Sequence, residues 1–341
     1  MNSLIKQHRQ LHPAMEVQDE VKLVFQAMVG CGHLLADEET VARRIAQEES
    51  AMQADASAPL VEPIGDRFLR VNLAAAMAAG ITPTQIARMM IQSASKPVPS
   101  REEVSSMLAR LGYTDAAKRL TQEPGWLPNH SQAYHRAYAP AYRVVGSQWR
   151  QALAVLRALH ALPEKERVLI CIDGPCGSGK SSLASQLQLL TDAAVVPMDD
   201  FFLPHPRKTP ERLAQPGGNA DWERLVEEFL QPWRQHGHAA YRPYRCGEQT
   251  FGAPVQVPPR KLTIIEGSYS LMPEIALHAD LRVFLTIDAA RQQERILRRN
   301  GEDMLRMFQT RWIPLEQAYF DAMALPDAAC LTLAPQPEVD V

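Results

Sequence analysis

Apolar and polar positions follow two different patterns along this chain, and the pattern changes about halfway. In residues 14–122 apolar side chains recur three or four positions apart, as at Val21, Val24 and Met28, which is the spacing of one helix face. From residue 167 on, short apolar runs alternate with amphipathic stretches. The first half is therefore expected to be mainly helical, and the second half to contain buried strands joined by helices.

Capping signals divide the first half into helices. Residues 38–52 read as a polar helix with one apolar side, and Ser100 forms a capping box with Glu103 ahead of another helix. One short strand is expected at 67–72, where the sequence is RFLRVN. Residues 1–125 are therefore predicted to form a mainly helical N-terminal domain, and the sequence does not indicate its role.

Residues 126–162 are expected to connect two domains. Residues 123–146 are rich in proline and aromatic side chains, and residues 147–162 read as a helix that Pro163 ends. The connection contains an aromatic and basic cluster, formed by Tyr134, His135, Arg136, Tyr138, Tyr142 and Arg143. These side chains could line a ligand cleft or simply pack the linker, and the sequence leaves both interpretations open.

Five short apolar runs mark the strands expected in the second half. They are Val168–Asp173, Ala194–Asp199, Leu262–Glu266, Leu281–Asp288 and Cys330–Leu333. Runs of this length without alternation suit strands that are buried on both faces of a parallel sheet. Residues 163–341 are therefore predicted to form an α/β domain with the three-layer P-loop NTPase architecture, in which helices sandwich a mostly parallel five-stranded sheet.

Composition narrows the class of protein. The chain has 341 residues, enough for two domains, and 46% of them are apolar and 22% charged, as in globular proteins with a sizeable core. The net charge of −3 gives no general basic excess for a nucleic-acid partner. No apolar run reaches the roughly 18 residues of a membrane helix, so no membrane association is expected. The composition does not indicate the number of subunits, so a homo-oligomer remains an open alternative.

The cysteines point to a reducing compartment. Five cysteines are scattered along the chain without a CxxC pair, which predicts neither a disulfide framework nor a paired-cysteine zinc site. The N-terminus lacks the apolar core of a signal peptide, so a cytoplasmic protein is expected. Cys31 and His33 supply too few ligands to predict a metal site, and packing explains them as well.

The strongest chemical signal is the segment GPCGSGKS at 174–181, which fits the phosphate-binding pattern GxxxxGK[ST]. Glycines let such a loop curl so that its backbone N–H groups surround a phosphate, and the following helix directs its positive end at the same anion. The residues expected to bind ATP are Gly174, Pro175, Cys176, Gly177, Ser178, Gly179, Lys180, Ser181 and Ser182.

Two side chains of this loop have separate expected roles. Lys180 is expected to act catalytically by neutralising the β- and γ-phosphates, and the Ser181 hydroxyl to bind Mg²⁺. Cys176 lies beside the helix N-terminus, where it is either a low-pKa thiol or a small residue that fills space. The chain lacks NKxD and LSGG segments, so a GTPase or a transporter-type ATPase has no support.

Carboxylates end two further apolar runs. Asp199 ends the second run, Asp200 follows it, and Glu266 ends the third. Ligands of open α/β sheets lie outside the carboxyl ends of the strands, so these groups are expected to face the phosphates. One aspartate can accept the proton of an attacking hydroxyl, and Glu266 can hold Mg²⁺ together with Ser181. Adjacent residues leave a strand on opposite sides, so only one of the two aspartates is expected to act as this base.

The order GPCGSGKSS, MDDFF and IIEG resembles the uridine kinase-like P-loop kinases, which are related to bacterial pantothenate kinase and phosphoribulokinase. The resemblance covers about residues 165–335, roughly half of the chain. It implies ATP-dependent phosphorylation of a small alcohol, most simply a nucleoside such as uridine or cytidine. It also favours Asp199 as the base, because MDDFF is similar to the family's Asp-Ser-Phe-Tyr motif.

The resemblance further implies an acceptor pocket. Tyr241 and Tyr244 lie in a segment similar to the family's Pro-x-Tyr, where an aromatic ring packs on the base, and Asp200 is assigned to the same substrate side. Asp221 is similar to the family's sugar-binding aspartate, although an ordinary loop aspartate explains it equally well. Residues 248–250 differ from the family's Thr-His-Ser-Arg segment, which keeps a sugar or a pantothenate-like alcohol open as the acceptor.

Arginines near residue 295 complete the expected site. Arg295 and Arg298 have the spacing of the family's lid arginines, which clamp the transferring phosphate, and a solvated basic helix face is the alternative. A second class of function also stays open. In it the P-loop half is a nucleotide-binding regulator without kinase turnover, and the N-terminal half binds a partner. The missing family histidine favours the regulator, whereas Asp199, Glu266 and the arginines favour the enzyme.

Overall fold

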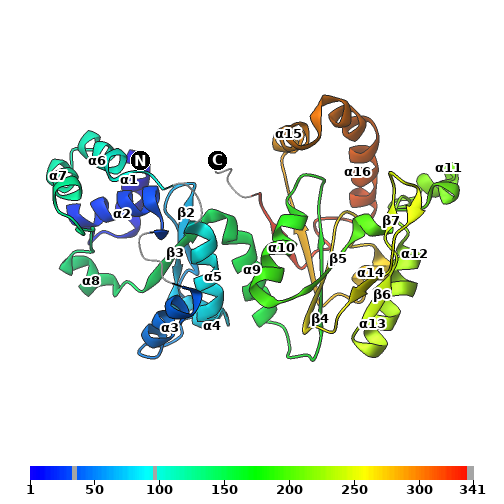
Figure 1. The fold of residues 1–341 in the computed structure, drawn as a ribbon, viewed down its shortest axis with the longest axis horizontal. Coiled ribbons are helices and arrows are strands. Elements are labelled where there is room, and N and C mark those ends of the chain that lie inside the picture. The colour runs from blue at the N-terminus through cyan, green and yellow to red at the C-terminus, as the bar shows by residue number, and fades with distance from the viewer. Residues whose placement is uncertain (33–36, 95–97, 336–341) are drawn as a thin grey trace. The chain divides into compact units, whose positions relative to one another are not determined.

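The computed structural model describes residues 1–32, 37–94 and 98–335, and the chain divides into two units, residues 1–160 and 161–335 (Figure 1). Among the described helices, none combines the length and the apolar character that crossing a membrane requires. The two units differ in architecture, since the first carries a small antiparallel sheet and the second a larger parallel one.

Unit 1 is mainly helical around a sheet of order β1-β2-β3. The antiparallel strands are Val61–Pro63, Phe68–Asn72 and Tyr142–Gly146, and the central strand β2 is buried along most of its length. The helices are α1 (Asn2–Leu11), α2 (Val17–Val29), α3 (Glu38–Glu49), α4 (Leu73–Ala78), α5 (Pro83–Ala94), α6 (Arg101–Arg110), α7 (Thr114–Gln122), α8 (Gln132–Tyr138) and α9 (Arg150–His160).

The helical prediction for the first half is confirmed, and the structure adds two strands. Ser100 caps α6 by accepting the N–H of Glu103, and the Glu103 carboxylate accepts the N–H of Ser100, which is the predicted capping box. The strand expected at 67–72 is present as β2. β1 has three residues and β3 lies in the proline- and aromatic-rich segment, so neither offers an alternating pattern long enough to be recognised.

The segment expected to be a connection contributes regular structure to unit 1. Within residues 126–160 the chain forms α8, β3 and α9, and β3 pairs with β2 along five residues. Tyr134 is buried, and Tyr142 begins the strand. Cys31 is also buried and donates its thiol to the Met90 carbonyl at 3.3 Å, while His33 lies outside the described residues.

Unit 2 is built on a five-stranded sheet in which all neighbouring strands are parallel. The order is β12-β11-β4-β10-β5, so the first strand of the unit lies in the middle of the sheet. The strands are β4 (Val168–Asp173), β5 (Ala194–Pro197), β10 (Leu262–Glu266), β11 (Leu281–Leu285) and β12 (Leu331–Leu333). All five predicted runs belong to this sheet, and the predicted α/β fold is confirmed.

Two strands end earlier than their apolar runs predict. β5 ends at Pro197 because Met198–Phe201 turn into a 3-10 helix. β11 ends at Leu285, and Asp288 instead caps the next helix by accepting the N–H of Arg291. Both departures occur at the carboxyl edge of the sheet, where a ligand of an open α/β sheet would bind.

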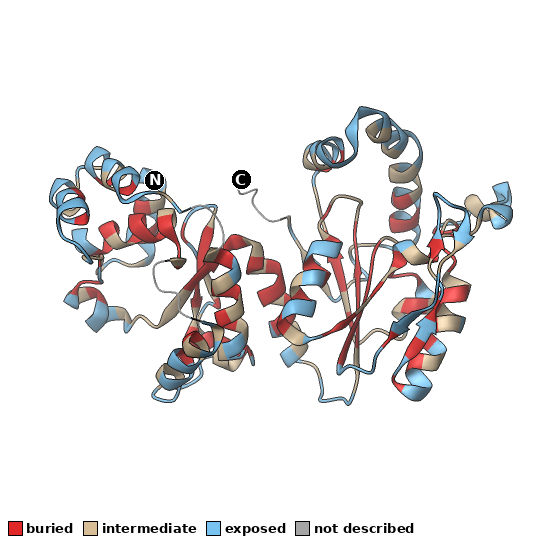
Figure 2. Cartoon of the chain, in the orientation of Figure 1, coloured by how far each residue is buried: buried red, intermediate tan, exposed pale blue. Residues whose placement is uncertain are grey.

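Helices cover both faces of the parallel sheet. On one face, Leu169 and Cys171 of β4 share a buried core with Phe229 and Tyr319 from helical segments further along the chain. The helix α10 (Lys180–Thr191) packs on β4, β5 and β10 but supplies none of the side chains of that core, so it covers the opposite face. Figure 2 shows the central strand β4 buried along most of its length.

The remaining elements of unit 2 include further helices, of which α15 is the longest, and two antiparallel strand pairs. The helices are α11 (Pro210–Leu213), α12 (Trp222–Arg224), α13 (Gln231–His236), α14 (Pro273–Ala276), α15 (Ala289–Met307) and α16 (Ile313–Ala322). The strand pairs are β6 (Ala239–Tyr241) with β9 (Val255–Val257), and β7 (Tyr244–Arg245) with β8 (Thr250–Phe251). Residues 225–230 and 308–312 continue neighbouring helices as π-helical turns.

Candidate active site

The phosphate loop joins the central strand β4 to α10 and depends on glycine at three positions. Gly174, Gly177 and Gly179 have φ angles of +142°, +79° and +103°, which L side chains rarely adopt. Gly174 also lies against the neighbouring strand, since a Cβ there would stand 2.3 Å from the Leu285 carbonyl oxygen. The curl of the loop and its close approach to β11 therefore both require these residues.

Asp173, the last residue of β4, fixes the start of the loop. It is fully buried, and its carboxylate accepts the N–H of Gly174 at 2.7 Å, the N–H of Leu271 at 2.9 Å and the hydroxyl of Tyr319 at 2.8 Å. Burial raises the pKa of Asp173 to about 6, and Lys180 and these hydrogen bonds oppose that effect. The sequence indicated Asp173 only as the end of a strand, because its partners Leu271 and Tyr319 lie 98 and 146 residues later.

The interior of the loop has the features of an anion site. Lys180 begins α10, and its Nζ donates to the carbonyl oxygens of Gly174 at 2.7 Å and Pro175 at 3.0 Å. The Ser178 hydroxyl oxygen is buried and has no hydrogen-bond partner among the described residues. A Cβ at Gly179 would meet no atom within 4 Å. A cation and a hydroxyl without a partner among the described residues therefore lie at this loop, and both suit an anion such as phosphate.

Side chains from the C-terminal helices fasten the outer part of this loop. Glu316 on α16 accepts the N–H of Cys176 at 2.9 Å and the hydroxyl of Ser268 at 2.5 Å. Gln292 on α15 donates to the Cys176 carbonyl at 3.0 Å, and Arg295 Nη1 donates to the Gly177 carbonyl at 3.0 Å. Glu316 and Gln292 were not predicted as site residues, since nothing in their local sequence marks them.

The environment of Cys176 favours one of its two interpretations. Its thiol accepts a hydrogen bond from Gln292 at 3.2 Å, and burial together with the Glu316 carboxylate raises the pKa of the thiol to about 12. A thiol with this pKa stays protonated near neutral pH. These surroundings favour the interpretation of Cys176 as a small residue that fills space over that of a low-pKa thiol.

The two side chains predicted to bind a metal ion are in contact. The Ser181 hydroxyl donates to Glu266 Oε2 at 3.1 Å, and Glu266 stands at the carboxyl end of β10, next to β4 in the sheet. Burial raises the pKa of Glu266, while the Ser181 hydrogen bond and Lys180 lower it. Hydroxyl and carboxylate oxygens are the hard ligands that Mg²⁺ prefers, so this pair fits such an ion.

Asp199 and Asp200 follow β5 and have different surroundings. Asp199 is exposed, and its charge raises the pKa of Glu266, though less than burial does. Asp200 is partly buried, accepts the hydroxyl of Tyr241 at 2.9 Å, and has a pKa raised mainly by burial. The exposed Asp199 is therefore the carboxylate available to a bound molecule, whereas Asp200 is engaged by the protein.

The aromatic residues predicted to line the acceptor pocket are both buried. Tyr241 packs against Phe201 with ring centroids 4.8 Å apart, besides its bond to Asp200. Tyr244 meets the ring of Phe251 at 5.3 Å, and its hydroxyl accepts the N–H of His205 at 3.2 Å. These contacts explain both tyrosines as structural residues, and their role toward a substrate stays a prediction.

Asp221 forms a buried ion-pair network. Its carboxylate is fully buried and accepts from Arg207 at 2.7 Å and from Arg224 at 3.2 Å. Arg224 also donates to the Asp200 carbonyl at 2.6 Å, so Asp221 is linked to the chain beside Asp200. The two arginines explain why the Asp221 carboxylate can be buried. Its contact with a sugar stays a prediction.

The two predicted lid arginines differ in position. Arg295 reaches the loop through the Gly177 carbonyl, whereas Arg298, one turn further along α15, is exposed. The helix is interrupted at Gly301, where φ is +80° and ψ is 175°. The structure thus brings Arg295, but not Arg298, to the phosphate loop.

The all-parallel sheet, with the loop between its central strand and a helix, defines unit 2 as a P-loop NTPase fold. No family model matches the chain. Solved structures that resemble it include a possible uridine kinase from Bacillus stearothermophilus, with a TM-score of 0.43 and 18% identity, which covers 55% of this chain and 99% of that one. Another is described provisionally as a fructose transport system kinase from Silicibacter sp. TM1040, with a TM-score of 0.43 and 24% identity over 55% of this chain and 98% of that one.

A curated relative is the Arabidopsis thaliana protein named inorganic pyrophosphatase TTM2, which is 26% identical over 220 residues. The match includes 58% of this chain and spans 31% of the length of that relative.

Proposed function

We propose that unit 2 transfers the γ-phosphoryl group of ATP to a hydroxyl of a small molecule, with Mg²⁺ as cofactor. The observation that carries the proposal is the hydrogen bond of 3.1 Å between the Ser181 hydroxyl and Glu266 Oε2. Ser181 directly follows Lys180, whose Nζ reaches back to the Gly174 carbonyl at the start of the loop. Asp199 follows the next strand at the same edge of the sheet. The proposed cation, metal ligands and base thus lie at the end of, or in the segments that follow, three adjacent strands of one sheet, β4, β10 and β5.

Each group has a separate task in the proposed reaction. The N–H groups at the start of α10 and the Lys180 ammonium hold the phosphates. Mg²⁺, when bound by Ser181 and Glu266, would neutralise charge on the phosphate oxygens. Asp199 accepts the proton of the attacking hydroxyl, and Arg295 balances charge that develops on the transferring group. Arg298 joins Arg295 only if α15 moves when substrates bind.

The acceptor is proposed to be a nucleoside such as uridine or cytidine, and this choice rests on the motif resemblance. A sugar or a pantothenate-like alcohol is the alternative, since residues 248–250 differ from the family's pattern. Asp200, Asp221, Tyr241 and Tyr244 stay the proposed substrate-side residues, although their buried contacts show that they also shape the fold.

The test is ATP consumption by the full chain against a panel of nucleosides, sugars and pantothenate. We expect one acceptor class to raise turnover well above the rate without acceptor, and Lys180→Ala and Asp199→Asn to abolish the increase. Asp192→Asn serves as the matched control, because Asp192 is exposed at the end of α10 in a left-handed conformation that asparagine tolerates. If no alcohol raises turnover while ATP still binds, the kinase proposal fails and the nucleotide-binding regulator is favoured.

Hydrolysis of a phosphoanhydride is a second candidate, favoured by the similarity to the protein named inorganic pyrophosphatase. In that case water takes the place of the alcohol and Asp199 accepts its proton. Inorganic pyrophosphate therefore belongs in the panel. Release of phosphate from pyrophosphate that Asp199→Asn abolishes and alcohols do not stimulate would favour hydrolysis over transfer.

A further inference from the structure

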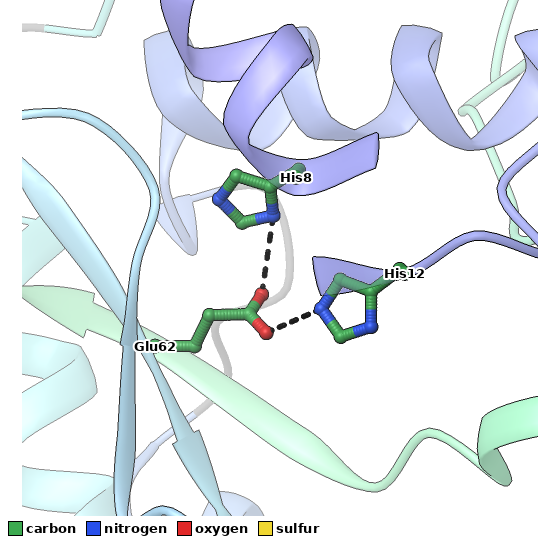
Figure 3. A group of neighbouring side chains, drawn as sticks. All are labelled: His8, His12 and Glu62. Atoms are coloured by element: carbon green, nitrogen blue, oxygen red, sulfur yellow. Dashed lines mark hydrogen bonds and ion pairs between the residues drawn. The ribbon is translucent and has the colours of Figure 1, made fainter. Parts of the chain in front are cut away.

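Two histidines and a glutamate lie close together in unit 1, whereas the phosphate loop belongs to unit 2 (Figure 3). His8 lies on α1, His12 is the C-cap of that helix, and Glu62 is the middle residue of β1. One nitrogen from each histidine and one carboxylate oxygen all lie within 4.8 Å of one another. Three potential metal ligands therefore converge at one point.

The fold itself brings these side chains together. Residues four apart on a helix lie on the same face, which aligns His8 with His12. The antiparallel register of β1 and β2 places Glu62 opposite Arg70, and Arg70 Nη1 donates to Glu62 Oε1 at 2.8 Å. The carboxylate is thus held in a fixed orientation by a neighbour that is not one of the three ligands.

His8 carries the most specific observation. It is 1% exposed, and its Nε2 lies 3.0 Å from the Pro63 carbonyl oxygen. A carbonyl oxygen only accepts hydrogen bonds, so Nε2 bears the proton and Nδ1 has the free lone pair. Nδ1 faces Glu62 Oε1 at 3.4 Å and has no hydrogen-bond partner among the described residues. A buried lone pair facing a carboxylate calls for a cation between them.

His12 completes the group from the other side of Glu62. Its Nε2 lies 2.6 Å from Glu62 Oε2, and its Nδ1 is buried without a hydrogen-bond partner among the described residues. The rings of Tyr134 and Tyr138 lie 5.5 Å and 5.0 Å from the His12 ring. Part of the aromatic cluster singled out in the sequence therefore forms a wall beside the three ligands.

We propose that His8, His12 and Glu62 bind a divalent transition-metal ion of the zinc class. Two imidazole nitrogens and one carboxylate oxygen suit zinc, whereas Mg²⁺ and Ca²⁺ prefer oxygen alone. On binding, the His12 proton moves from Nε2 to Nδ1, and the 2.6 Å separation from Glu62 widens to about 3.4 Å, the edge of a tetrahedron with zinc–ligand bonds near 2.1 Å. Three protein ligands leave the fourth position for water or another ligand.

The charge of Arg70 works against the bound cation. Its guanidinium shares Glu62 Oε1 and stays protonated at any physiological pH. The affinity therefore depends on all three ligands acting together, and removal of any one is expected to have a large effect.

The proposal is tested on the full chain after treatment with a chelator. Calorimetry with Zn²⁺ and visible absorption with Co²⁺ are expected to show one equivalent bound per chain, with a Co²⁺ spectrum typical of four-coordination. His12→Gln and Glu62→Gln should each weaken binding by about 100-fold or more. His160→Gln is the matched control, because His160 is an exposed histidine of the same unit, and it should bind as the unchanged chain does.

Thermal unfolding separates loss of a ligand from loss of folding. Zinc should raise the melting temperature of the unchanged chain and of His160→Gln, and should not raise that of either ligand variant. If the unchanged chain shows neither saturable binding nor a zinc-dependent rise, the three side chains form an ion-pair cluster and the proposal is wrong. Equal binding by all variants overturns it as well, since the ion would then be held elsewhere.

Discussion

Replacing Gly174 by alanine tests how the phosphate loop is held against the sheet. The new Cβ would stand 2.3 Å from the carbonyl oxygen of Leu285, about 1 Å inside ordinary van der Waals contact, and φ at this position is +142°. The obstacle is backbone of the neighbouring strand β11, so no side chain can turn aside to relieve it. Either the loop or the end of β11 must move.

The magnitude follows from two costs. An unfavourable backbone conformation costs about 1–3 kcal/mol, and overpacking that shifts backbone costs about another 1–3 kcal/mol. Gly174→Ala should therefore destabilise unit 2 by about 2–6 kcal/mol. Gly179→Ala is the matched control, because φ there is +103° but no atom lies within 4 Å of the added Cβ, so the conformational cost of about 1–3 kcal/mol applies alone.

Hydrogen exchange of the β4 amides, followed by mass spectrometry under increasing urea, measures this difference within unit 2 even if the two units unfold separately. Protection of residues 168–173 should fall much further in Gly174→Ala than in Gly179→Ala. If Gly174→Ala kept the protection of the unchanged chain, or if Gly179→Ala lost more of it, the close approach to Leu285 could not be what fixes the loop.

Two further predictions concern one polar side chain in each unit, Glu316 in unit 2 and His130 in unit 1. Glu316→Ala leaves the Cys176 N–H unpaired and should destabilise unit 2 by about 1–3 kcal/mol, which lowers the melting temperature, and should also lower the nucleotide affinity. Glu316→Gln keeps an acceptor and should recover most of both. Equal losses in the two variants would contradict this reasoning. In unit 1, burial lowers the pKa of His130 to about 4, so between pH 6.5 and 4 the unfolded chain binds more protons and stability should fall as the pH falls, by at most about 1.4 kcal/mol per pH unit. Urea unfolding of unit 1 across pH 4–7 should show a flatter dependence in His130→Gln, and an unchanged slope would refute the assignment.

The parts of the site that sequence predicted are those in which the chemistry requires contiguous residues. A phosphate loop needs its glycines, its lysine and its hydroxyl within eight positions, so GPCGSGKS is recognisable without a structure. The positions of Glu266 and Asp199 were predicted because strand ends converge at one edge of a parallel sheet, whereas the roles of both residues stay predictions. The contact between Ser181 and Glu266 follows directly from that geometry.

The parts that sequence did not predict depend on side chains far apart in the chain. Glu316 meets Cys176 across 140 positions, and Tyr319 meets Asp173 across 146. Neither Glu316 nor Tyr319 is unusual in a helix, so no local pattern marks them. The group of His8, His12 and Glu62 was missed for the same reason, since its third ligand comes from a strand of only three residues.

The backbone N–H groups of the phosphate loop fall into two groups, those that are hydrogen-bonded within the protein and those that remain available to an anion. The N–H groups of Gly174, Cys176 and Ser178 donate to Asp173, Glu316 and the Pro175 carbonyl, and these bonds fix the shape of the loop. The N–H groups that begin α10 have no intrahelical partner by helix geometry, so they are the ones left for an anion. The shape of the anion site therefore depends on a carboxylate of α16 that need not touch the nucleotide. It follows that changes in α16 can alter nucleotide affinity while every residue of the GPCGSGKS segment stays the same.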